Sequence, residues 1–247
     1  MRMLLKHVFN AAFAALLFCS CVDDHGQEGH VTKHKFSVSY AEGNVADSLG
    51  LVLNDDLAVS GGTEPLKIRK GTAEGKAAEA EEYYAAYPAE AFLYFSPDEP
   101  SSVTMRLPVV QTAVKGSIPS ETDLAVASTS SDEMSFEFGD MLSYIRFGIT
   151  EEAGKLRSIS LISTYGARIS GDFAVSCLDE DSEVFPMPSS ASNVSLKPSG
   201  EYFEPGEYYV AVSLKLTGGS YMSCLKMSPE NLPSKAFPQW MIQQTDG

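Results

Sequence analysis

The feature that most constrains this chain is a recurring alternation of apolar and polar residues in short runs. Residues 36–40 alternate strictly, and residues 208–216 place an apolar side chain at every second position. A period of two is typical of a strand with one buried face. Long amphipathic helices are not apparent, and proline and glycine fall between the runs, as strand geometry requires. The sequence therefore predicts an all-β fold, an antiparallel sandwich or barrel.

Further strands are expected at similar spacing along the chain. Residues 49–59 predict a strand or a hairpin around 54–56, whereas residues 71–82, without a clear apolar face, predict a loop or one short helix. A polar, turn-rich stretch at 116–133 divides the set, so we predict two β-sandwich domains, residues 34–127 and 128–247. The other predicted strands are residues 66–69, 83–87, 91–95, 103–107, 133–138, 142–149, 156–162, 167–177, 193–196 and 221–227.

The N-terminus has the layout of an export signal. Basic residues precede an apolar stretch at 8–18, which is shorter than the ~20 residues that span a bilayer. Ser20 and Cys21 then precede two acids, an arrangement that resembles the lipobox of bacterial lipoproteins. We predict a signal peptide over residues 1–20, acyl chains on Cys21 and a flexible polar tether over 21–33. The alternative is an ordinary signal peptide that happens to contain cysteines.

Charge and cysteine usage exclude several functions. The chain has a formal net charge of −15, and a field of that sign repels phosphate backbones, so we expect no nucleic-acid partner. Cys177 and Cys224 either pair in an oxidising compartment or remain as buried thiols. Neither lies in a spacing that binds zinc, and we expect no metal and no cofactor.

Catalytic motifs are also missing from the sequence. All four histidines lie at or before His34, so we predict a folded body without histidine, the commonest general base. The neighbouring acids Asp55 and Asp56, like those at 179–181, are better placed for solvated turns than for paired-carboxylate catalysis or calcium binding. We therefore predict that the protein is not an enzyme.

Aromatic residues offer two interpretations. Those at 83–87 and 202–209 could form a face that stacks on sugars, but cross-strand packing explains them more simply. The apolar C-terminal segment contains Phe237, Trp240 and Ile242. It is either a donor strand for another subunit's sheet or the last strand of its own domain.

Several segments, in order, resemble the fimbrillin family, fimbrial subunit lipoproteins of Gram-negative gut and oral bacteria. The resemblance spans about residues 83–215, although the histidine usual in the family's F-x-F-x-H-x-L-S strand is replaced here by Asp140. The matching segments are 83–88 (Y-x-A-Y-P), 107–111 (LP-x-x-Q), 123–127 (D-L-x-x-A), 136–143, 159–171 (I-x-L…I-x-G) and 206–210 (G-x-Y-Y-V).

This resemblance implies two transthyretin-like β-sandwich domains and an outer-membrane, fimbrial location. It also implies assembly in which an arginine-directed protease removes the first strand and a strand from a neighbouring subunit fills the groove. Arg69 is the first arginine after the signal and the candidate processing site. The implied partners are other fimbrial subunits, the outer membrane through the lipid, and a host or bacterial receptor. An accessory, tip or anchor subunit that keeps its lipid fits equally well, and a monomeric surface lipoprotein that binds glycans is the alternative.

Overall fold

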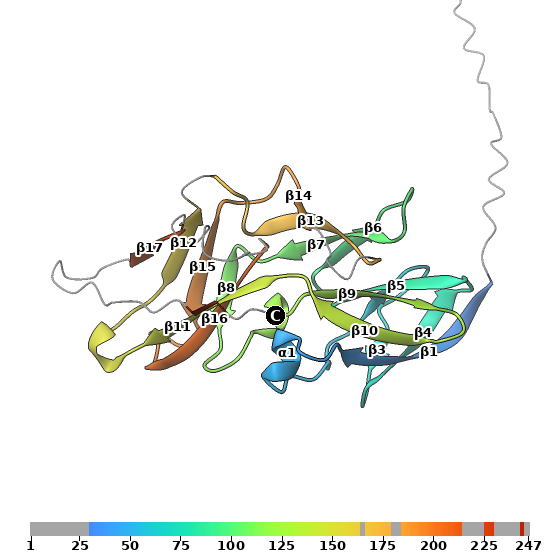
Figure 1. Ribbon diagram of the computed structural model, residues 1–247, viewed down its shortest axis with the longest axis horizontal. Coiled ribbons are helices and arrows are strands. Elements are labelled where there is room, and N and C mark those ends of the chain that lie inside the picture. Colours follow the sequence, from blue (N-terminus) through green and yellow to red (C-terminus); the bar gives the residue numbers. More distant parts are fainter. Residues whose placement is uncertain (1–29, 164–165, 179–183, 214–224, 230–242, 245–247) are drawn as a thin grey trace, which may run out of the picture.

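The computed structural model describes residues 30–163, 166–178, 184–213, 225–229 and 243–244 (Figure 1). Strands dominate the described chain, which confirms the prediction of an all-β fold. The helical elements there are one turn of α-helix, α1 (Val45–Ser48), and two 3-10 turns, η1 (Ser120–Thr122) and η2 (Glu151–Ala153). The predicted signal peptide, Cys21 and residues 21–29 of the tether lie outside the described residues.

The largest sheet has seven strands in the order β2-β5-β9-β10-β1-β4-β3. It curls so that its own strands enclose a core, because buried residues of β1, β4, β5, β9 and β10 belong to one cluster. The strand bounds are β1 (Val31–Tyr40), β2 (Ala58–Val59), β3 (Lys67–Ile68), β4 (Thr72–Ala78), β5 (Glu82–Tyr87), β9 (Ala125–Ser130) and β10 (Ser135–Asp140).

A four-stranded sheet, in the order β14-β13-β7-β6, packs over β5 and β9. Its strands are β6 (Phe92–Phe95), β7 (Ser102–Leu107), β13 (Gly171–Ser176) and β14 (Val184–Pro186). Ala85 faces the core of the curled sheet, whereas its neighbour Ala86 faces the core beneath β7 and β13. Strands β5 and β9 are thus buried on both faces, which explains why buried residues in β9 do not alternate.

The remaining strands form a second sandwich. One sheet has the order β16-β11-β18 and the other β17-β12-β15-β8. Ile145 and Phe147 face the core between these sheets, while Tyr144, on the other face of β11, packs into the core of the first half. The bounds are β8 (Val110–Ala113), β11 (Ser143–Ile149), β12 (Ile159–Ser163), β15 (Asn193–Pro198), β16 (Gly206–Val212), β17 (Leu225–Pro229) and β18 (Gln243–Gln244).

Strands from both halves of the sequence share sheets. The predicted boundary between residues 127 and 128 falls inside β9. Strand β10 pairs with β1, and β13 pairs with β7, so hydrogen-bonded ladders connect the two predicted domain ranges. The sheets therefore do not separate at residue 127.

Two local predictions were wrong. One missed a strand made of small residues, and the other expected a strand or hairpin in a segment that is mostly irregular. Residues 72–78, expected as a loop or helix, form β4, whose buried side chains are only Ala73 and Ala77. Small residues are needed because Leu66 packs closely here: a Cβ on Gly75 would lie 2.7 Å from Leu66 Cγ. Residues 49–59, expected as a strand or hairpin, are mostly irregular after α1, with only the two residues of β2 in a strand.

Candidate functional site

The candidate assembly site is β1, which lies inside the seven-stranded sheet. It pairs antiparallel with β4 from Val31 to Ser37 and parallel with β10 from Ser37 to Tyr40. Figure 1 shows the three strands side by side, with β1 entering at one end of the molecule. Removing such a strand would leave unpaired backbone groups on both of its neighbours.

Aromatic contacts hold the middle of β1. Phe36 is fully buried, and its ring centroid lies 5.1 Å from that of Tyr83 and 4.9 Å from that of Phe136. Val38 follows on the same face, and both belong to the core of the curled sheet. The alternation predicted for residues 36–40 is thus confirmed, and β1 contributes Phe36 and Val38 to this core.

His34 corrects one prediction. Its ring lies 5.9 Å from Phe36 and 5.2 Å from Tyr83, and Nε2 is 2.9 Å from Thr32 Oγ1. The prediction that the folded body contains no histidine is wrong, because His34 lies within β1 and packs against Phe36 and Tyr83. Residues 31–33, assigned to the predicted tether, belong to the strand.

A buried polar cluster holds the C-terminal end of β1. The Tyr40 hydroxyl donates to the Asp123 carboxylate. Asp140, the last residue of β10, accepts a 2.7 Å hydrogen bond from Val45 N, and Asn44 Oδ1 caps the same turn by accepting from Ala46 N. Side chains and backbone from β1, α1, β10 and the segment after η1 therefore meet at this point.

Burial dominates the electrostatics of this cluster. Desolvation, above all, raises the pKa of Asp123 to about 6, although the Tyr40 hydrogen bond opposes the shift. Burial likewise raises the pKa of Asp140 and of Tyr40. Sequence reasoning missed the cluster because its members are far apart in the chain and form no recognisable motif.

Arg69 lies in the tight turn between β3 and β4. Its backbone N–H donates to Thr72 O at 2.7 Å, and Thr72 N–H donates back at 3.2 Å. Lys70 and Gly71 have positive φ angles of 52° and 71°, as a two-residue hairpin turn requires. Arg69, Lys70 and Gly71 are all exposed. Arg69 is therefore at the surface, and cleavage after it stays a prediction.

The other predicted site residues fall mostly outside the described chain. Phe237, Trp240, Ile242 and Cys224 lie there, whereas β18, which follows them, pairs with β11 at Ile145 and Arg146. Cys177 has no disulfide partner among the described residues; it is 7% exposed, and burial raises the pKa of its thiol to about 12. Pairing of Cys177 with Cys224 stays a prediction.

A second surface feature lies on the outer face of the β14-β13-β7-β6 sheet. Phe185, Ala174, Thr104 and Tyr94 are in register across the four strands. Three strand spacings place the two ends of this row about 14 Å apart. Phe185 is 56% exposed and Tyr94 47% exposed. The row therefore has an exposed aromatic side chain at each end, whereas Thr104 between them is buried.

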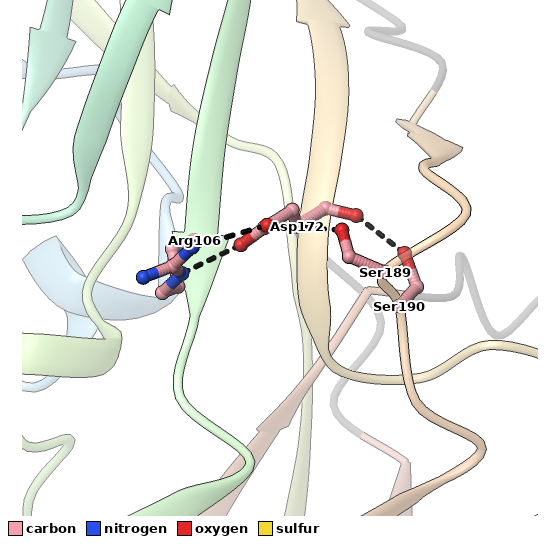
Figure 2. Close-up of polar contacts among 4 residues, drawn as sticks. All are labelled: Arg106, Asp172, Ser189 and Ser190. Carbon is pink, nitrogen blue, oxygen red and sulfur yellow. Dashed lines mark hydrogen bonds and ion pairs between the residues drawn. The ribbon is translucent and has the colours of Figure 1, made fainter.

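An ion pair borders this aromatic row. Arg106 Nε and Nη2 donate to the two Asp172 carboxylate oxygens at 2.6 and 3.1 Å. Figure 2 shows the contact between the two side chains. Ser189 Oγ donates to Asp172 Oδ2 at 2.9 Å, and the Ser190 hydroxyl donates to the Asp172 backbone carbonyl. Arg106, above all, holds the pKa of Asp172 below its usual value. The four residues fasten the segment after β14 to the sheet.

Metal clusters and membrane-spanning helices are both absent from the part of the chain that the structure describes. Among them, no group of three or more His, Cys, Asp or Glu side chains could hold a metal ion. Within the same ranges, no helix has the length and apolarity needed to cross a bilayer.

A solved structure is distantly similar to this chain. No protein-family model matches the chain, and no curated protein matches it. A crystal structure from Bacteroides ovatus ATCC 8483, provisionally described as a cell adhesion protein, is similar with a TM-score of 0.42 and 9% identity. The similarity covers 72% of this chain and 76% of that one.

Proposed function

We propose that this chain is a structural or accessory subunit of a cell-surface fimbria, anchored in the outer membrane through Cys21 and assembling by β-strand addition. The position of β1 carries the proposal. It is central in its sheet, it supplies Phe36 and Val38 to the core, and it begins ten residues after Cys21. The strand that fills the groove is thus also the segment nearest the lipid.

Cleavage after Arg69 would separate β1, β2 and β3 from the rest of the chain. The exposed edges of β4 and β10 could then pair with a strand from another subunit, which would also cover the uncovered apolar face. The same cut would release the body from its membrane anchor. A subunit that is not cleaved would stay attached to the membrane as a tip or anchor component.

An arginine-specific protease tests this proposal. Wild-type chain and an Arg69→Lys variant are digested and analysed on gels with and without heating in detergent. We expect the wild type to be cleaved at Arg69 and to form multimers that dissociate only when heated in detergent. The variant should not be cleaved at this position, should keep β1 and should form no such multimers. Complete cleavage at Arg69 that yields only monomers would rule out strand exchange.

The aromatic row favours a second candidate function, glycan binding at the cell surface. Sugar rings stack on exposed aromatic faces, and Arg106 and Asp172 beside the row offer polar groups for hydroxyls. The acidic chain would disfavour anionic sugars, so neutral oligosaccharides are the expected ligands. A glycan array with Tyr94→Ala and Phe185→Ala variants, and Ile162→Ala on the other sandwich as control, tests this. Binding that survives both aromatic substitutions would reject the row as the site.

A further inference from the structure

The outer face of β1, β4 and β3 concentrates positive charge on an acidic protein. We define the basic face by six exposed side chains, which are Lys33, Lys35, Lys67, Arg69, Lys70 and Lys76. The chain contains 18 lysines and arginines against 33 acids, so a third of its basic residues lie on this small surface. Within the described part of the chain, two acids, Glu74 and Asp56, form ion pairs with it.

The strand register places these charged side chains next to one another. Lys67 on β3 and Lys35 on β1 both lie opposite Glu74 on β4, and Lys33 lies directly opposite Lys76. Glu74 Oε2 is 3.3 Å from Lys33 Nζ, and Glu74 Oε1 is 3.6 Å from Lys35 Nζ. The Glu74 carboxylate therefore forms ion pairs with two lysines. Lys33 and Lys76, which have the same charge, lie directly opposite each other on neighbouring strands, and such a pair destabilises a sheet.

An acidic surface lies at one end of the same sheet. We define the acidic tip by Glu79, Glu81 and Glu82 before and within β5, together with Asp132 and Glu133 in the β9–β10 turn. Ser131 N donates to Glu81 O at 2.8 Å, so the two segments lie side by side. All five acids are exposed, and residues 79–82 and 130–134 contain no lysine or arginine. Among the five, Glu79 contacts His30, with Oε1 3.4 Å from Nδ1.

We infer that the basic face of one uncut chain docks against the acidic tip of a second copy. The two surfaces are different patches on one molecule, so their contact is head-to-tail and leaves one of each free. Such contacts can extend into open chains. Exposed ion pairs add little affinity, but opposed patches accelerate encounter and fix orientation.

This docking goes beyond strand exchange, and it belongs to the uncut protein. Cleavage after Arg69 would remove Lys33, Lys35, Lys67 and Arg69 with the N-terminal fragment, and so most of the basic face. Encounter of uncut subunits through charge would therefore precede processing, and processing would abolish it.

Sedimentation velocity on the uncut full chain tests the inference, with Cys21→Ala in every sample to prevent lipidation. The basic-face variant is Lys67→Glu with Lys76→Glu, and the acidic-tip variant is Glu81→Lys with Glu82→Lys. The control, Lys115→Glu with Lys197→Glu, makes the same charge change as the basic-face variant, but on the second sandwich. Neutral Lys67→Gln with Lys76→Gln covers the case in which a reversal variant fails to fold.

Wild type and control are expected to associate reversibly at low salt, and about tenfold more weakly when salt shortens the screening length. Each reversal variant alone should associate at least about tenfold more weakly. Mixing the two should restore association, because each then offers a surface complementary to the other.

A wild type that stays monomeric at low salt would overturn the inference, as would variants that associate normally or a mixture that does not recover. If the wild type is monomeric and is retained on an anionic polysaccharide, and the basic-face variant is not retained, the basic face would be assigned to that polymer instead. None of these outcomes depends on cleavage at Arg69, so failure here is separate from failure of strand exchange.

Discussion

The hydroxyl of Tyr40 donates to the carboxylate of Asp123, which joins the last residue of β1 to the segment between η1 and β9. Asp123 is 5% exposed and Tyr40 half-buried. A buried carboxylate needs such a donor, because its lone pairs have lost water. The contact therefore secures the end of the strand that the proposed assembly would displace.

Stability should depend on pH through Asp123. Burial raises its folded-state pKa to about 6, above its ordinary value, so this group stabilises the fold most fully in acid and less as pH rises through 6. The difference between pH 4 and pH 7.5 should reach about 2 kcal/mol for this group. Urea unfolding of wild type and Asp123→Asn at both pH values measures it, and the variant should show the smaller difference. Equal pH dependence in the two proteins would show that Asp123 titrates normally.

Gln111 should stabilise the contact between the two sheets of the second sandwich. Its amide donates to Ala211 O at 2.9 Å and accepts from Ala211 N at 3.0 Å, so it acts like a strand neighbour of β16. Gln111→Ala would leave both buried backbone groups unpaired and should lower the free energy of unfolding by about 2–4 kcal/mol. Urea denaturation checks this, with exposed Thr112→Ala as control. A loss below about 0.5 kcal/mol would mean that water replaces the amide.

Gly171 should tolerate no side chain. Its φ is +90°, and an added Cβ would lie 2.9 Å from Ser190 Cα, within the segment that Asp172 fastens. Gly171→Ala should cost about 1–3 kcal/mol, because backbone strain and the close contact add. Gly148→Ala is the matched control, since its added Cβ meets nothing within 4 Å. Thermal unfolding compares the two, and equal melting temperatures would contradict the strain.

The sequence predicted strands best where large apolar residues alternate. Phe136 and Phe138 of β10, like Ile145, Phe147 and Ile149 of β11, face cores as their spacing indicates. Strand β4 was missed because Ala73, Gly75 and Ala77 carry almost no apolar signal, although tight packing against Leu66 requires small residues. Propensity and pattern depend on side-chain size, whereas close packing can reverse that preference.

Which strands lie side by side could not be predicted from the sequence, for a different reason. A period of two assigns each side chain to a face but does not say which strand lies beside it. Val38 therefore indicated a buried face, but not that it pairs with Phe136 across a parallel ladder. For the candidate site, Arg69 was found because arginine is rare early in the chain, while Tyr40 and Asp123 meet only after folding.

Cys177 should react slowly in the folded protein. Its thiol is buried and its pKa is raised to about 12 by desolvation, so little thiolate forms at pH 8. In a chain with its other cysteines replaced by serine, alkylation should be at least about 100-fold slower than in the unfolded state. An exposed cysteine introduced by Ser135→Cys in place of Cys177 serves as control. With the native cysteines present, a non-reducing peptide map decides whether Cys177 pairs with Cys224, and fast native alkylation in the serine background would contradict its burial.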